Sequence, residues 1–229
     1  MSSDKLVAAK KAVEMVDDGD IIGVGSGSTV SLFIEQIANS GKRITAVPTS
    51  LDTVNRLAEK GIETTSLSHV KKLRLTVDGA DQVDFKLKLI KGGGGAFTKE
   101  KIVAYSSEEF VVIVDNSKLV RKLGVSCPVP LEFVFDAYPL IQNTAEKRFG
   151  ATLNLRGGAG KLPPLISDNG LVLGDLTFKE GVNRPEALED ELNAIPGVLE
   201  NGLFTKHKNV TLIVGDAGSP KIYQNEIKA

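Results

Sequence analysis

Apolar positions in the first half of the chain alternate between two spacings. Leu6, Ala9, Val13 and Val16 recur every three or four residues, as in a helix, and DIIGVGSG (residues 20–27) reads as a short buried strand ending in glycines. The alternation predicts further helices in STVSLFIEQIANSG (28–41) and LDTVNRLAEKG (51–61, with Leu51 facing inward), and strands in ITAVPTS (44–50), IETTSL (62–67), LRLTV (73–77) and FVVIVD (110–115). Strands alternating with helices predict crossover connections and a doubly wound, mostly parallel α/β sheet.

The pattern changes after Cys127. The expected order is then strand, helix, strand, strand, helix, strand. The strands are expected in PVPLEFVF (128–135), ATLNLR (151–156) and PLISDNGLVLGDLTF (164–178), the helices in YPLIQNTAEKRFG (138–150) and RPEALEDELNAIPGV (184–198), and the last strand after the second helix. This order resembles a ferredoxin-like α+β unit, with Asp168-Asn169-Gly170 as a turn signal between two strands. We therefore expect an α/β catalytic domain of residues 1–127 plus 206–229, and a small α+β domain of residues 128–205.

Composition narrows the class of protein. The 229 residues are 41% apolar and 25% charged, as in ordinary globular proteins, and 28 basic against 29 acidic residues favour neither a nucleic-acid nor a membrane partner. One cysteine and two histidines argue against a disulfide, a thiolate cluster or a histidine metal cage. The polar start MSSDKLVAAKK lacks the core of a signal peptide, so we expect a cytoplasmic protein.

Three stretches rich in glycine or aspartate follow predicted strands, at the sheet edge where open α/β proteins bind ligands. The first is GVGSGST (23–29), whose amides at the start of a helix, with the hydroxyls of Ser26, Ser28 and Thr29, suit a phosphate group. It is not a nucleotide P-loop, because no Gly-Lys-Ser/Thr follows. Taken alone, the stretch fits a tight strand-to-helix turn equally well.

The other two stretches carry charge. In TVDGADQVD (76–84), Asp78 and Asp81 could bond to sugar hydroxyls, although a surface turn stabilised by aspartate is the more usual reading of such a segment. In KGGGGAFTKEK (91–101), Lys91 precedes four glycines, and Glu100 falls in the first turn of a helix. A favourable charge at a helix N-terminus would explain Glu100, but four glycines exceed what a turn requires.

Together the three stretches offer an anion cradle, carboxylates for hydroxyl groups, an isolated carboxylate base and a lysine. A metal-ligand set, a catalytic histidine and a nucleophile elbow are missing from them. This inventory fits abstraction of a proton next to the carbonyl of a phosphorylated polyol, with a cation stabilising the enediolate. General base catalysis contributes roughly 10²–10⁴-fold, and stabilisation of the oxyanion is often the largest single effect.

The motifs GVGSGST, DGADQ (78–82), KGGGGAFTKEK, VDNSK (114–118) and NAIPGVLENGLF (193–204), in this order, resemble the ribose-5-phosphate isomerase A family over nearly the whole chain. The resemblance implies an isomerase that interconverts D-ribose 5-phosphate and D-ribulose 5-phosphate through an enediol, in the non-oxidative branch of the pentose phosphate pathway. It implies no metal and no other cofactor, and it favours a homodimer or homotetramer. Gln82 departs from the family, which usually has an acid there.

The resemblance also assigns roles to residues. It implies that Glu100 is the general base, that Lys91 stabilises charge on the sugar oxygens, and that Asp78 and Asp81 bind hydroxyls and assist ring opening. The implied substrate-binding residues are Ser26, Gly27, Ser28, Thr29, Asp78, Gly79, Ala80, Asp81, Lys91, Gly92, Gly93, Gly94 and Lys118, with Lys5 as a further contact to phosphate.

Two alternatives stay open at this point. A CoA-transferase-like enzyme of related architecture would use Glu100 as a nucleophile. A sugar-phosphate-sensing protein of the same fold would need a DNA-binding helix-turn-helix, for which the 20 N-terminal residues are too few. Arg156 to Lys161 form another glycine-rich segment, which we interpret as a flexible loop of the small domain.

Overall fold

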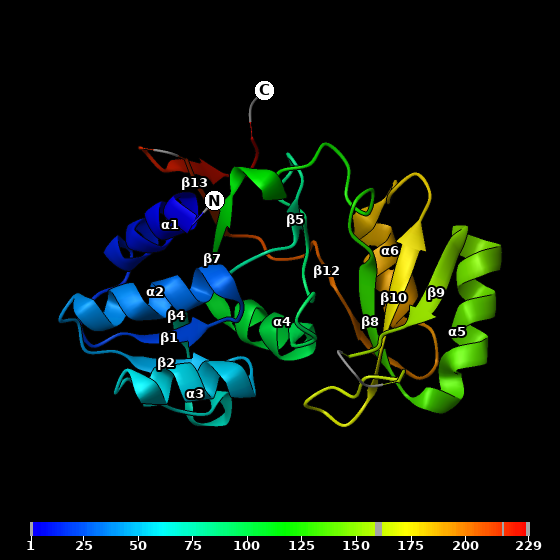
Figure 1. Cartoon of the computed structure of the whole chain (residues 1–229), viewed down its shortest axis with the longest axis horizontal. Helices are drawn as coiled ribbons and strands as arrows, with labels where there is room; N and C mark the ends of the chain where they lie inside the picture. The colour runs from blue at the N-terminus through cyan, green and yellow to red at the C-terminus, as the bar shows by residue number, and fades with distance from the viewer. Residues whose placement is uncertain (1, 159–161, 217, 228–229) are drawn as a thin grey trace.

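The computed structural model describes residues 2–158, 162–216 and 218–227, which form a large and a small lobe (Figure 1). In the large lobe the described strands are β1 (Ile21–Val24), β2 (Thr45–Pro48), β3 (Glu63–Thr64), β4 (Leu73–Asp78), β7 (Ser107–Asp115), β13 (Val210–Gly215) and β14 (Lys221–Gln224). They lie in the order β14-β13-β7-β4-β1-β2-β3, and all neighbours are parallel except β13 and β14. The order runs outward from β1 in both directions, which confirms the doubly wound α/β sheet.

Helices cover both faces of this sheet. They are α1 (Ser2–Glu14), α2 (Ser28–Asn39), α3 (Leu51–Glu59) and α4 (Phe97–Tyr105). Alternate residues of β7 separate the faces: Val111 and Ile113 belong to the apolar cluster that contains residues of α1, α2 and α3, whereas Val112 belongs to the cluster with Phe97 of α4. The segment IETTSL pairs as a strand only at 63–64, and residues 67–69 form a 3₁₀ turn, η1 (Leu67–His69).

The small lobe has the element order expected from the sequence. Its elements are β8 (Val129–Phe133), η3 (Phe135–Ala137), α5 (Tyr138–Thr144), β9 (Ala151–Leu155), β10 (Val172–Phe178), α6 (Pro185–Asn193) and β11 (Val198–Asn201). The strands form an antiparallel sheet in the order β11-β8-β10-β9, and α5 and α6 share one apolar cluster with it. A π-helical turn, η4 (Ala145–Phe149), extends α5 until Gly150 ends it with φ 61°.

A third, small sheet was not predicted. It pairs β5 (Gln82–Val83), β6 (Leu89–Ile90) and β12 (Leu203–Phe204) between the two lobes, and a 3₁₀ turn, η2 (Asn116–Lys118), follows β7. The division at residues 127/128 and 205/206 stays a prediction, supported by the separate sheets of the two lobes. No helix within the described ranges has the length and apolar character needed to cross a membrane.

Candidate active site

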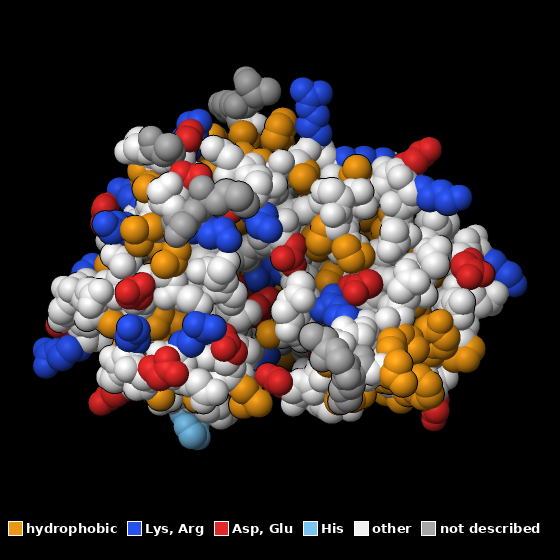
Figure 2. Space-filling view, viewed as in Figure 1, with side chains coloured by type: hydrophobic (Ala, Val, Ile, Leu, Met, Phe, Trp, Pro, Cys, Tyr) orange, Lys and Arg blue, Asp and Glu red, His pale blue; other side chains and the backbone are white. Residues whose placement is uncertain are grey.

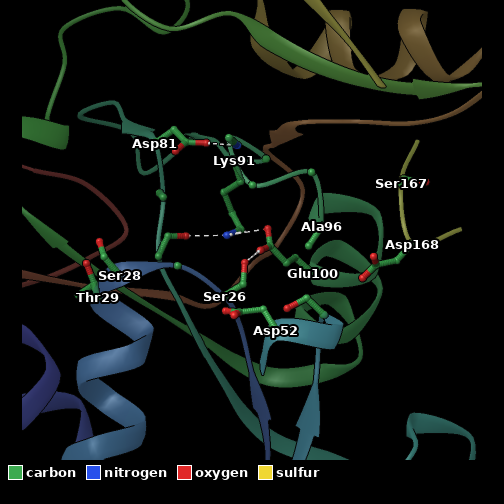
Figure 3. Close-up of a pocket in the computed structure, with 18 of the residues that line it drawn as sticks. Ser26, Ser28, Thr29, Asp52, Asp81, Lys91, Ala96, Glu100, Ser167 and Asp168 are labelled. Atoms are coloured by element: carbon green, nitrogen blue, oxygen red, sulfur yellow. Dashed lines mark hydrogen bonds and ion pairs between the residues drawn. The ribbon is translucent and has the colours of Figure 1, made fainter. Parts of the chain in front are cut away.

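A cavity of about 470 Å³ lies between the two lobes, beyond the C-terminal ends of β1, β2, β4 and β7 (Figures 2 and 3). Figure 2 shows the hollow, in which lysine and acidic side chains meet. The sequence-predicted residues among its lining are Ser26, Gly27, Ser28, Thr29, Gly79, Ala80, Asp81, Lys91, Gly92, Gly93, Gly94, Glu100 and Lys118, together with Lys5. Segments far apart along the chain therefore converge here, as expected for the outer edge of a doubly wound sheet.

One end of the cavity is cationic and lies at the start of α2. Gly27 precedes the helix with φ 90°, and among the described residues no side chain caps the helix N-terminus by a hydrogen bond. The ammonium of Lys5 donates to Ser28 Oγ over 2.9 Å, and Lys118 lines the same cavity. Amides, hydroxyls and two lysines at a helix N-terminus are an arrangement that binds a phosphate.

The centre of the cavity holds a buried lysine between two carboxylates. Lys91 Nζ lies 2.9 Å from Asp78 Oδ2 and 3.0 Å from Glu100 Oε2, and it donates to the carbonyl oxygen of Gly79 over 2.7 Å. Ser26 Oγ donates to Glu100 Oε1 over 2.6 Å. Figure 3 shows Ser26, Lys91 and Glu100 pointing toward one another from the loop after β1, the end of β6 and the first turn of α4. The site therefore presents a carboxylate and an ammonium to the same point of the cavity.

The charges of this cluster are strongly coupled. Burial, together with the neighbouring charge of Glu100, raises the pKa of Asp78 to about 7, although Lys91 opposes this rise. Burial alone would lower the pKa of Lys91, but the two carboxylates outweigh it and raise that pKa above its usual value. Lys91 therefore stays an ammonium, while Asp78 takes up a proton close to neutral pH.

The two aspartates of the DGADQ motif occupy different places. Asp78 is fully buried beneath the cavity, where its Oδ1 accepts the backbone N–H of Ser26 over 3.2 Å and that of Gly79 over 2.7 Å. A Cβ at Gly25 would lie 1.9 Å from its carboxyl carbon, so only glycine admits Asp78 there. Asp81 lines the cavity and accepts the N–H of Gly93 over 2.8 Å. The geometry thus favours hydroxyl binding by Asp81, and support of Lys91 by Asp78.

Arg156 of the small lobe holds the glycine loop that follows Lys91. Its Nη1 donates to the carbonyl oxygen of Gly92 over 2.8 Å, and its Nε donates to Asp175 Oδ2 over 2.9 Å. The N–H of the same peptide plane, that of Gly93, points to Asp81. Sequence reasoning placed Arg156 in a flexible loop of the small domain and missed this role, and residues 159–161 of that loop lie outside the described residues.

The other end of the cavity is acidic and lies at the start of α3. Ser50 caps this helix by accepting the N–H of Thr53 over 3.1 Å, and Asp168 of the small lobe accepts the N–H of Leu51 over 3.3 Å. Leu51 is 63% exposed at the cavity rim, so its predicted inward orientation was wrong. Sequence reasoning also missed Asp168, because the chain separates it from α3 by more than a hundred residues.

The described residues contain no group of three or more histidine, cysteine, aspartate or glutamate side chains arranged to hold a metal ion.

Comparison with known proteins identifies the relatives of the chain. The family model described as "Ribose 5-phosphate isomerase A (phosphoriboisomerase A)" matches residues 45–218, and the model "DeoR C terminal sensor domain" matches residues 1–88. The ribose-5-phosphate isomerase A of Archaeoglobus fulgidus is 44% identical over 227 residues, which are 96% of this chain and 98% of that protein.

Solved structures agree with this result. The ribose 5-phosphate isomerase A of Methanocaldococcus jannaschii superposes with a TM-score of 0.90 at 39% identity, covering 96% of this chain and 98% of that one. A D-ribose-5-phosphate isomerase in complex with phospho-erythronic acid gives a TM-score of 0.91 at 39% identity, covering 96% of this chain and 97% of that one.

Proposed function

The chain belongs to the ribose-5-phosphate isomerase A family and interconverts D-ribose 5-phosphate and D-ribulose 5-phosphate; on this premise we propose that Glu100 carries the proton and Lys91 stabilises the enediolate. The observation that supports this proposal most is that the two side chains meet at the cavity, where Lys91 Nζ lies 3.0 Å from Glu100 Oε2. A base and a cation that act on adjacent carbon and oxygen atoms have to lie this close together.

The phosphate group of the substrate binds at the cationic end of the cavity. Lys5, the hydroxyls of Ser28 and Thr29 and the N-terminus of α2 lie there, and Lys118 lines the same cavity. Anchoring the phosphate at this end directs the first two carbons of the sugar toward the centre of the cavity. The free energy gained from the phosphate then serves to position the reacting atoms.

The reaction transfers one proton between neighbouring carbons. The Glu100 carboxylate removes the proton from C2 of the open-chain aldose, and the C–H electron pair forms the C1–C2 double bond while the carbonyl electrons move to O1. The Lys91 ammonium stabilises the resulting negative charge. Glu100 then returns the proton to C1, and O2 becomes the ketone oxygen as its own proton is passed to O1. Neither the charge nor the atom count changes.

We assign different work to the two aspartates. Asp81, which lines the cavity, binds a sugar hydroxyl and assists opening of the furanose ring. Asp78 is fully buried and accepts hydrogen bonds from two backbone amides. It keeps Lys91 in place, so that the positive charge of Lys91 lies between Asp78 and Glu100. Lys91 is thereby held by both carboxylates at once, at the point of the cavity that Glu100 faces.

The test is the activity of Glu100→Gln on ribose 5-phosphate. We expect turnover to fall by ~10² or more, because glutamine cannot accept the proton. Glu108→Gln is the control, since Glu108 is a carboxylate that also pairs with a lysine, Lys72, but lies on the surface and outside the cavity. Normal turnover in Glu100→Gln would refute the assignment, and loss of wild-type activity with a chelator would contradict the metal-independent mechanism.

We also propose that the chain forms a homodimer or homotetramer. Exposed apolar side chains gather on the small lobe (Figure 2), and Val134, Phe135 and Leu140 are 47%, 54% and 45% exposed between the end of β8 and the first turns of α5. A patch of this kind favours a protein partner. Light scattering on the purified chain should give two or four times the monomer mass, and a monomer at micromolar concentration would contradict the proposal.

A further inference from the structure

Two helix N-termini face each other across the cavity, and only one of them is open. Figure 3 shows Ser28 and Thr29 of α2 at one side, Asp168 at the other, the Lys91–Glu100 pair between them, and Asp52 of α3 below that pair. The N-terminus of α2 has no side-chain cap within the described residues and lies beside Lys5. Each helix N-terminus attracts an anion through its free amides and its dipole, so both ends could in principle hold a phosphate.

The N-terminus of α3 is already occupied by a carboxylate of the protein. Asp168 reaches it from the loop that precedes β10 and accepts the N–H of Leu51, the first residue of the helix, over 3.3 Å. Asp168 lines the cavity, and within the described residues no lysine or arginine forms an ion pair with its carboxylate. Asp52 at the same end is different, because Arg56 neutralises it over 2.7 Å.

A buried carboxylate keeps the Asp168 loop in position. Glu132 of β8 is fully buried and accepts hydrogen bonds from Ser167 Oγ, from the side-chain amide of Asn169 over 3.0 Å, and from Thr98 Oγ1 in the first turn of α4. The residues on both sides of Asp168 are therefore tied to the helix that carries Glu100. This anchoring fixes the distance between the Asp168 carboxylate and the reacting part of the cavity.

We propose that Asp168 is a built-in anion that closes the α3 end of the cavity to phosphate, and so restricts the enzyme to sugars with a single phosphate group. The inference rests on the proposed function, which puts C1 and C2 of the sugar beside Lys91 and Glu100 and hence C1 toward Asp168. A pentose 1,5-bisphosphate would bring its C1 phosphate against the Asp168 carboxylate. The same repulsion prevents ribose 5-phosphate from binding in the reverse direction.

The experiment compares two inhibitors of ribose 5-phosphate turnover in the same protein samples. Ribulose 1,5-bisphosphate carries a phosphate on C1 and probes the α3 end. Phospho-erythronic acid, the ligand of a related solved structure, has one phosphate and four carbons and ends in a carboxylate, so it carries no group at the position of the C1 phosphate. The ratio of the two inhibition constants cancels any general effect of a substitution on folding or on the catalytic centre.

The variants are Asp168→Asn and Asp168→Ala, with Asp52→Asn as the matched control at the same end of the cavity. We expect wild type to bind the bisphosphate much more weakly than phospho-erythronic acid. Asp168→Asn should shift the ratio toward the bisphosphate by roughly tenfold, because one negative charge is removed at short range. Asp168→Ala should shift it at least as far, since the amide of Leu51 also becomes free. Asp52→Asn should shift it less than threefold.

Each outcome decides the proposal. An unchanged ratio in Asp168→Asn, or equal binding of both inhibitors by wild type, would overturn it. A shift in Asp168→Ala without one in Asp168→Asn would also overturn it, because size and not charge would then exclude the C1 phosphate. Failure of the proposed function would look different: wild type would not turn over ribose 5-phosphate, and phospho-erythronic acid would not compete with it.

Discussion

The two buried lysines near Phe204 have similar surroundings and different roles. Lys91 and Lys101 each lie within about 3 Å of two carboxylates, and their ammonium nitrogens stand 5.5 and 5.0 Å from the centre of the Phe204 ring. Glu100 and Lys101 are neighbours on α4, yet Glu100 faces the cavity whereas Lys101 faces α6 and β11. A lysine between two carboxylates thus forms a reactive centre on one side of the helix. On the other side the same arrangement, Lys101 with Glu189 and Glu200, connects the two lobes, and we call it the structural joint.

The difference lies in how completely the carboxylates are bonded. Glu189, the partner of Lys101, also accepts the N–H of Thr205 over 2.9 Å, the Thr205 hydroxyl and the Tyr105 hydroxyl. Glu100 accepts only the Ser26 hydroxyl besides its ion pair with Lys91, among the contacts of the described residues. A carboxylate whose oxygens are all occupied cannot take a proton from a ligand, and a carboxylate with a free direction toward a cavity can.

The largest expected effect comes from breaking the structural joint. Lys101→Met should lower the free energy of unfolding by about 3–5 kcal/mol, because Glu189 is left buried without a cation. Urea denaturation measures the change, and Lys99→Met, an exposed lysine on the same helix, should stay within about 0.5 kcal/mol of wild type. A loss below about 1 kcal/mol in Lys101→Met would show that the joint does not hold the lobes together.

The next effect sharpens the comparison through pH. The folded pKa of Asp78, about 7, lies above the ordinary value of 3.8, so the folded chain binds this proton more tightly than the unfolded chain does. The stability that Asp78 contributes is therefore complete below about pH 4 and is lost as pH rises toward 7. The slope is at most about 1.4 kcal/mol per pH unit.

Asp78→Asn should remove this contribution. Urea unfolding at pH 5 and pH 8 should show a smaller decline of stability with pH in the variant than in wild type. Asp81→Asn, which leaves the Lys91 cluster intact, serves as the control and should keep the wild-type slope. If the unfolding free energy of Asp78→Asn and of wild type had the same slope with pH, Asp78 would not take up a proton in this pH range.

A smaller effect concerns the support of the reactive centre. Arg156→Gln should reduce kcat/KM about tenfold, because the peptide between Gly92 and Gly93 loses one of the two groups that hold it. Arg156→Lys should restore part of the loss, and Arg148→Gln, an exposed arginine of the same lobe, should have no effect. If stability falls in Arg156→Gln while kcat/KM remains unchanged, Arg156 supports the small lobe alone.

The smallest effect tests the hydrogen bonding of the structural joint. Burial and the nearby Glu189 raise the pKa of Tyr105 above its ordinary value, so its hydroxyl remains a donor at alkaline pH. Tyr105→Phe should cost about 1 kcal/mol of unfolding free energy and leave turnover unchanged. A large loss of turnover with normal stability would show that the two lysine clusters are coupled and not separate.

The reactive side of this comparison was largely predictable from the sequence. The stretches GVGSGST and DGADQ follow predicted strands, and the ends of parallel strands meet at one edge of a sheet. Lys91 and Glu100 follow β6, a strand that was not predicted, and the resemblance to a known family identified their roles. The position of Asp78 was not predictable, because it depends on the close approach of Gly25 from another strand. A spacing of three residues between two aspartates does not reveal which of them is buried.

The contributions of the small lobe could not be predicted for a different reason. Arg156, Ser167 and Asp168 lie on segments that read as ordinary loops and turns, and the turn at Gly170 does form with φ 78°. Their function depends on how the small lobe sits against the large one, and no local periodicity encodes that placement. The Arg156–Asp175 pair was detectable only as a possible contact between neighbouring strands.

The rigid peptide plane between Gly92 and Gly93 connects movement of the lobes to chemistry. Arg156 of the small lobe donates a hydrogen bond to the carbonyl oxygen of this peptide, and the N–H of the same peptide donates to Asp81. Because a peptide unit rotates as one rigid plane, movement of the small lobe away from the large one would rotate this peptide and break its hydrogen bond to Asp81. A hinge motion that lets a sugar enter or leave the cavity would therefore also change the orientation of Asp81, which binds the sugar.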